Sequence, residues 1–180
     1  MAATRILIEL DNGKGKRAAL NSIRLAQQLG GEYALLVLGH GLDEAAGSLS
    51  DYGASAVIVA DDAALAEPLA DRYAAVIVEA LKTSGAQTLL ASSSTFSKDI
   101  LPRAAALLDA PMLTDVLEDD RPAFRLPITA GSTLAPVTLS AARHELTPHQ
   151  TASTAPKPAH HLHPTHHNIP AESATRPHPH

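Results

Sequence analysis

The chain has 180 residues, with 14 lysines and arginines, 19 aspartates and glutamates and no cysteine. Its net charge of −5 argues against a nucleic-acid-binding protein, and the lack of cysteine excludes a disulfide scaffold, a thiolate metal site and a cysteine nucleophile. No apolar run approaches the roughly 20 residues that span a bilayer, and a strand-like run starts at Arg5, so we expect a cytoplasmic protein without a leader peptide or membrane insertion.

Short apolar runs alternate with helical patterns along the first two thirds of the chain. Four nearly continuous apolar runs predict strands that are covered on both faces, at residues 5–10, 32–38, 56–60 and 88–92. The helical patterns between and after them place apolar faces at Ala19, Leu20, Ile23 and Ala26, at Leu69, Tyr73, Val76, Ala80 and Leu81, and at Ile100, Leu101, Ala104, Leu107 and Leu108. A shorter helix is expected within 42–52. This order predicts an α/β fold, a three-layer doubly wound sheet that is mostly parallel.

The pattern changes after residue 112. A further strand is expected at 113–117, followed by an antiparallel pair, 123–128 and 132–137, joined through Gly131. Nine of the ten histidines follow Ala142, and no glycine follows Gly131. We therefore expect a Rossmann-like α/β domain over residues 1–138 and a disordered Pro/His-rich tail over residues 139–180.

Few positions carry recognisable chemistry. The loop 11–17 lacks the spacing of a phosphate-binding loop and is interpreted as a solvated turn. The run 92–95 (SSST) either holds a phosphate at a strand end or caps the following helix. Asp61 and Asp62 have no evident partner in the sequence, which favours a capping role, and the isolated His40 favours a structural role.

The histidines of the tail are dense enough to bind Zn²⁺ weakly in any flexible chain. Specific binding needs a fixed geometry, which a proline-rich segment does not provide. We therefore expect no metal site and no catalytic residue, and the sequence indicates a scaffold without an evident active site.

A set of motifs then resembles one family. Residues 13–31 lead into a strand that ends in Gly39-His40-Gly41, and residues 95–103 (TFSKDILPR) are followed by Thr114-Asp115-Val116 and by 127–131 (PITAG). In this order and spacing the chain is similar to the N-terminal domain of the electron transfer flavoprotein alpha subunit, from about Arg5 to Val137. It departs from the family at Ser97, where glycine is usual, at Thr129, where an aromatic residue is usual, and at Ser132, where asparagine is usual.

The resemblance implies a subunit of a heterodimeric electron carrier that contains FAD, and not an enzyme. Such carriers take electrons from flavin dehydrogenases, such as the acyl-CoA dehydrogenases of fatty acid β-oxidation, and pass them to a quinone oxidoreductase. Family members continue into a second, glycine-rich domain that binds FAD, whereas this chain has no glycine after residue 131. The resemblance therefore implies a truncated alpha subunit that docks a beta subunit and holds no FAD alone, with no cofactor-binding residue expected within this chain.

The residues expected at the partner interface lie where the fourth strand ends and the last helix begins. They are Ser94, Thr95, Phe96, Lys98 and Arg103, because aromatic and arginine side chains often anchor interfaces. Packing of Phe96 beneath the last helix is an equal alternative. Two other functions stay open: an adenine-nucleotide-binding module of the same architecture, and an interaction protein without a cofactor.

Overall fold

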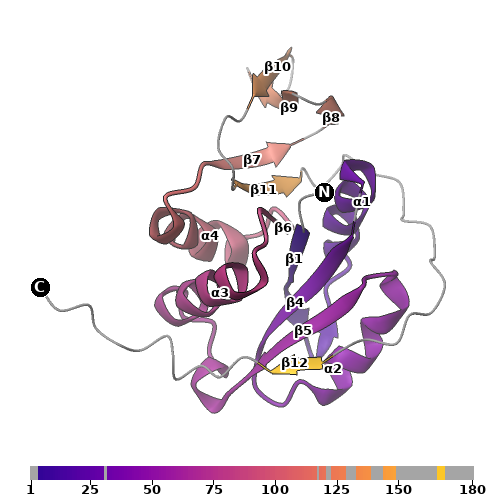
Figure 1. The fold of residues 1–180 in the computed structure, drawn as a ribbon, viewed down its shortest axis with the longest axis vertical. Helices are drawn as coiled ribbons and strands as arrows, with labels where there is room; N and C mark the ends of the chain where they lie inside the picture. The colour runs from indigo at the N-terminus through magenta and orange to yellow at the C-terminus, as the bar shows by residue number, and fades with distance from the viewer. Residues whose placement is uncertain are drawn as a thin grey trace, which may run out of the picture.

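The computed structural model describes residues 4–30, 32–116, 118–120, 123–128, 133–138, 144–148 and 166–168. Figure 1 shows a twisted sheet with helices on both faces, and the predicted α/β architecture is confirmed. Within the described part of the chain, no helix is both long enough and apolar enough to cross a membrane.

The main sheet has seven strands, and every neighbouring pair in it is parallel. In chain order the strands are β1 (Thr4–Ile8), β4 (Tyr33–Gly39), β5 (Ala56–Asp61), β6 (Thr88–Ala91), β7 (Met112–Val116), β11 (His144–Pro148) and β12 (His166–Asn168). In space they lie in the order β12-β5-β4-β1-β6-β11-β7. The sheet therefore grows outward from β1 in both directions, which is the doubly wound arrangement.

Alternate residues of the central strands enter two separate cores. Ile6 and Ile8 of β1 pack under α1 (Ala19–Leu29) and α2 (Asp43–Ser48), which is followed by the short helix η1 (Ser50–Tyr52). Leu7 packs on the other face under α3 (Ala70–Ser84) and α4 (Thr95–Leu108), together with the short helix η2 (Ala63–Leu65). Because both faces are covered, β4 is buried at all seven positions, and its sequence lacks the polar alternation of a half-exposed strand.

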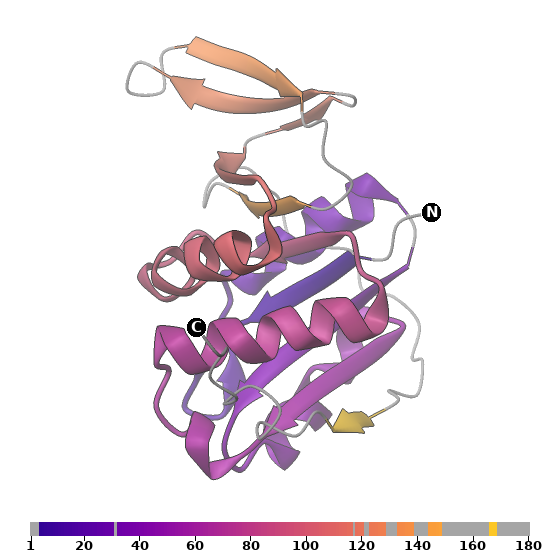
Figure 2. The same cartoon turned by 60° about the vertical axis from the view of Figure 1, so that its left-hand side comes forward.

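Two small antiparallel sheets accompany the main one. A hairpin follows β1, formed by β2 (Leu10–Asp11) and β3 (Lys14–Gly15). The other sheet contains β8 (Glu118–Asp120), β9 (Ala123–Ile128) and β10 (Thr133–Thr138), with β9 in the middle. Figure 2 shows this three-stranded sheet standing out from one end of the α/β body. The predicted antiparallel pair at 123–128 and 132–137 is thereby confirmed to within one residue.

Two leucines of the predicted apolar faces are exposed. Leu69 is 51% exposed because it precedes α3 in an extended conformation, and α3 itself begins at Ala70. Leu107 is 53% exposed although Ile100, Leu101 and Ala104 of the same helix are buried. The other residues predicted to form the buried face of α3, from Tyr73 to Leu81, are buried.

Within residues 139–180, the predicted tail, the structure describes two short strands. His144, Glu145 and Leu146 of β11 lie in register with β6, and the same strand pairs with β7 on its other side. His166–Asn168 forms β12 along the outer edge of β5. Main-chain hydrogen bonds to neighbouring strands can hold a segment in a sheet even when its sequence has no apolar periodicity. Sequence patterns alone therefore do not predict such strands. The remainder of the tail lies outside the described residues.

Candidate functional site

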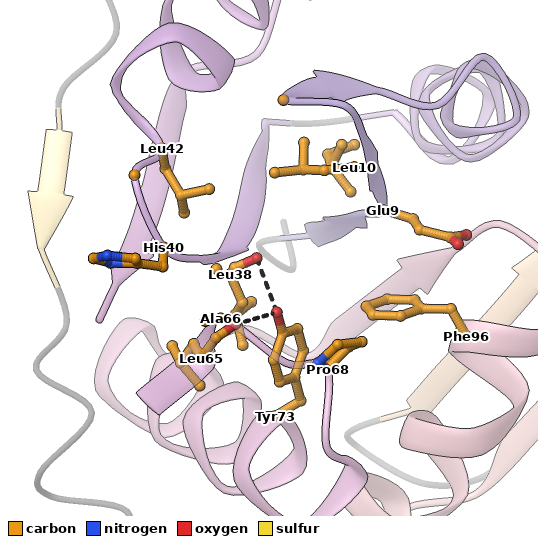
Figure 3. Close-up of a pocket in the computed structure, with 14 residues that line it drawn as sticks. Glu9, Leu10, Leu38, His40, Leu42, Leu65, Ala66, Pro68, Tyr73 and Phe96 are labelled. Atoms are coloured by element: carbon orange, nitrogen blue, oxygen red, sulfur yellow. Dashed lines mark hydrogen bonds between the residues drawn. The ribbon is translucent and has the colours of Figure 1, made fainter. Parts of the chain in front are cut away.

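A pocket of about 290 Å³ lies at the carboxyl ends of the central strands. It forms where the strand order reverses, because the chain runs outward from β1 to β5 and then crosses back to β6 on the other side of β1. Open α/β sheets bind ligands at this position. In Figure 3, His40 and Leu42 lie on one side of the pocket and Glu9 and Phe96 on the opposite side, with Leu10 between them.

Two aromatic rings form one wall of the pocket. Tyr73 and Phe96 meet edge to face, with their ring centroids 5.7 Å apart. The Tyr73 hydroxyl donates to the carbonyl of Leu65 at 2.9 Å and also lies 3.3 Å from the carbonyl of Leu38. Burial, with a smaller effect of the Glu67 carboxylate, raises the pKa of Tyr73, so this phenol remains a protonated donor at neutral pH.

Glu9 is the acidic side chain that lines the pocket. Its Oε1 lies 2.5 Å from Nζ of Lys16, and this hydrogen bond raises the pKa of the lysine. Its Oε2 is buried and has no hydrogen-bond partner in the described structure. Glu9 is brought to the pocket by the hairpin that follows β1, and Lys16 follows β3 of the same hairpin. One carboxylate oxygen is thus neutralised while the other is left as a spare acceptor.

The turn after β4 is organised by a carboxylate from the neighbouring strand. Oδ1 of Asp61 accepts from the backbone N–H of Gly41 at 2.9 Å, and Oδ2 accepts from Leu42 at 2.7 Å. Nδ1 of His40 lies 3.4 Å from the same carboxylate. The hydrogen bond from Leu42 is the largest cause of the lowered pKa of Asp61, and Gly41 and His40 contribute in the same direction.

The structure therefore corrects the sequence interpretation of Asp61. A partner for it exists in His40, which is brought within reach because Gly39 and Asp61 are paired residues of β4 and β5. Asp62 behaves as predicted, since its side chain accepts from the N–H of Ala64 and caps η2. The structural role expected of His40 agrees with its place in the turn.

The serine run before α4 is used for capping. The Ser94 hydroxyl accepts from the N–H of Ser97 at 3.2 Å, and the Ser97 hydroxyl accepts from the N–H of Ser94 at 3.1 Å. Ser97 is buried, and its hydroxyl also donates to the carbonyl of Ser92. Of the two interpretations of this run, helix capping is the one whose hydrogen bonds are present.

The five predicted interface residues do not form one exposed patch. Ser94 is part of the cap, and Phe96 is partly buried and packs edge to face on Tyr73 of α3. Thr95 and Lys98 are exposed. Arg103 is exposed and forms an ion pair with Asp71 of α3 at 2.7 Å.

The pocket is small for a ligand site, since about 290 Å³ is at the lower end of the range for small-molecule sites. The backbone N–H groups of Gly41 and Leu42 at this strand end are bound to Asp61. The part of the chain that the structure describes also contains no cluster of metal-ligating side chains, and the side chains of the tail histidines lie outside it.

Comparison with known proteins identifies the family. The model of the electron transfer flavoprotein domain matches residues 4–159. The chain belongs to the electron transfer flavoprotein family. It is 36% identical over 142 residues to the electron transfer flavoprotein subunit alpha of Pseudomonas aeruginosa, a match that covers 78% of this chain and 45% of the relative. The resemblance indicated by the sequence motifs is thereby confirmed.

Two further relatives are similar to this chain. The mitochondrial electron transfer flavoprotein subunit alpha of Oryza sativa subsp. indica is 35% identical over 143 residues, 75% of this chain and 40% of the relative. The acryloyl-CoA reductase electron transfer subunit beta of Anaerotignum propionicum is 32% identical over 92 residues, 51% of this chain and 25% of the relative. The chain thus spans less than half the length of these relatives.

Proposed function

We propose that this chain supplies the scaffold and docking part of an electron transfer flavoprotein alpha subunit. It acts within a heterodimeric electron carrier and is not itself a catalyst. The observation that carries the proposal is the family match over residues 4–159. The matches to the two alpha subunits cover less than half of the length of those subunits. The unmatched part of such subunits would hold the redox centre.

The three-stranded sheet β8-β9-β10 supports a docking role. It projects from one end of the α/β body in both views of the ribbon (Figures 1 and 2). A sheet of three strands is stable in water when it has an apolar face to pack. We propose that a beta subunit packs against this sheet, and the relative from Anaerotignum propionicum that is named an electron transfer subunit beta supports the existence of such subunits among similar proteins.

The cofactor proposal follows from the pocket. We propose that FAD belongs to the assembled carrier and that this chain alone does not retain it. The small volume of the pocket at the carboxyl ends of the strands and the binding of its turn to Asp61 support this proposal. We propose that the assembled carrier is cytoplasmic, accepts electrons from flavin dehydrogenases, such as acyl-CoA dehydrogenases, and passes them to a quinone oxidoreductase. The role of this chain is then to position the other parts of the carrier.

The test uses purification with and without partners. The full chain is purified alone, and again after co-expression with an electron transfer flavoprotein beta subunit, and flavin absorbance is measured in both preparations. We expect association with the beta subunit and no stoichiometric flavin on the chain alone. Stoichiometric flavin on the isolated chain would contradict the cofactor proposal, and failure to associate would contradict the docking proposal.

The start of α4 offers a second docking region. We propose that exposed Thr95 and Lys98 face the partner and that Arg103 supports them, and the double variant Lys98→Ala, Arg103→Ala tests this. Its affinity for the beta subunit should fall if these side chains lie in the interface. The variant Asp71→Ala is the control, since it removes only the partner of Arg103 on α3. Unchanged affinity of the double variant removes both cations from the interface.

A further inference from the structure

We propose that the pocket at the carboxyl ends of β1, β4 and β6 binds a small planar ligand that donates N–H groups, an amide or an amidinium, and rejects the corresponding carboxylate. This site is separate from the proposed docking function and does not depend on it. The observations that carry it are the cavity itself, its aromatic wall and the unpartnered oxygen of Glu9.

The spare acceptor gives the pocket its selectivity. Three buried side-chain atoms of the described residues lack a hydrogen-bond partner: Nε of Arg5, Oε2 of Glu9 and Oγ of Ser22. Of these residues only Glu9 lines the pocket. A buried acceptor left without a donor costs about 1–3 kcal/mol, and more when it is charged, so a ligand that supplies an N–H recovers free energy at this point.

The charge around Glu9 sets which ligands are accepted. Lys16 holds Oε1, whereas Oε2 keeps its capacity to accept from an uncharged N–H donor or from a cation. The lining itself contains no lysine or arginine in the described structure, and its other titratable side chains are His40 at the rim and Tyr73 in the wall. Tyr73 already donates to Leu65, so an anion would find no free donor there and would face the Glu9 carboxylate.

The shape of the pocket favours a flat apolar body. Leu10, Leu38 and Leu65 line it together with the edge-to-face pair Tyr73 and Phe96. Oε2 of Glu9 has almost no exposed surface, so the proposal requires a movement of the Phe96 ring, which is only partly buried and lies beside the carboxylate in Figure 3. A ring of benzene size with one polar group fits both features of the site.

The experiment compares three molecules of the same shape and different charge. Benzamide, benzamidine and benzoate are titrated into the full chain, and binding is followed by two-dimensional NMR. Benzamide and benzamidine should bind saturably, with dissociation constants on the order of millimolar for ligands of this size, and should shift the signals of Leu10, Tyr73 and Phe96. Benzoate should bind at least about tenfold more weakly.

Two charge-matched variants separate the site from a general charge effect. Glu9→Gln should weaken benzamidine about tenfold, because the new amide is neutral and no longer a charged acceptor. Glu44→Gln makes the same change of net charge on the exposed side of α2, outside the pocket, and should leave all three affinities unchanged. Lys16→Met should retain benzamidine binding, since it removes only the occupant of Oε1.

Each contrary outcome overturns the proposal. Benzoate binding as tightly as benzamide would show that Glu9 does not select the ligand. Equal effects of Glu9→Gln and Glu44→Gln would assign the selectivity to net charge. Absence of saturable binding by benzamide and benzamidine up to their solubility limits would show that the pocket is not a ligand site, and circular dichroism of each variant establishes that it is folded.

Discussion

Asp61 links two strands of the sheet through one carboxylate. It closes β5, accepts two backbone N–H groups from the turn after β4 and lies beside His40. None of these contacts is visible in the sequence, because the interacting residues are about 20 positions apart and meet only through the register of β4 and β5. Its neighbour Asp62 makes a local cap, which is why sequence reasoning found the role of that residue.

Asp61→Asn should destabilise the protein by about 1–2 kcal/mol, because an amide accepts only one of the two hydrogen bonds and lacks the charge that strengthens them. Asp62→Asn is the control, and it should be nearly neutral since asparagine caps helices as well as aspartate does. Urea unfolding at neutral pH measures both changes. Equal midpoints for the two variants would contradict the special role of Asp61.

The effect of Asp61 should depend on pH with a defined sign. Its pKa is lowered in the folded protein, so its contribution is present above the ordinary aspartate pKa of about 4 and is lost as the pH falls through the lower folded value. The stability difference between the wild type and Asp61→Asn should therefore be constant near neutral pH and shrink in acid. A difference that grows in acid would reverse the assignment.

At the scale of elements, local signals predict most of the α/β body. Gly85 ends α3 in the left-handed conformation, with φ 63°, and the apolar stripe of α1 ends at Gly30. The hairpin β2–β3 was missed, although its signal is present. Asn12 and Gly13 have φ of 50° and 74° between two paired strands, the pattern of a tight turn in which both central residues have positive φ.

Two glycine substitutions should have opposite signs. Gly13→Ala should cost about 1 kcal/mol, because alanine is strained at φ +74° although no atom blocks its Cβ. Gly47→Ala lies in α2 with open space around its Cβ, and it should stabilise the protein by about 0.5–1 kcal/mol. Thermal and urea unfolding compare the two. Stabilisation by Gly13→Ala would contradict the turn assignment.

At the scale of the whole molecule, β11 is one of the elements that the sequence did not predict. Its five residues end in Pro148 and include His144 and Glu145, so they lack the apolar alternation of an isolated strand. Its place depends on the space between β6 and β7, which exists only once both strands are in the sheet. The pocket was missed for a similar reason, because Glu9, His40 and Phe96 come from the segments that follow three different strands.

Removing β11 should therefore weaken the sheet. A chain ending at residue 138 lacks the strand that joins β6 to β7, and it should lose about 2 kcal/mol or more of stability, since each backbone hydrogen bond contributes about 1 kcal/mol net. A chain ending at residue 159 keeps β11 and should lose less. Equal urea midpoints for both chains and the full protein would show that β11 does not support the sheet.

The scaffold and docking role is tested most directly by the mass of the complex in solution. Light scattering during size-exclusion chromatography is measured on the full chain mixed with a purified electron transfer flavoprotein beta subunit. The account predicts one peak with the summed mass of the two chains, and no flavin absorbance attributable to this chain when it is run alone. Two separate peaks at the masses of the individual chains would contradict it.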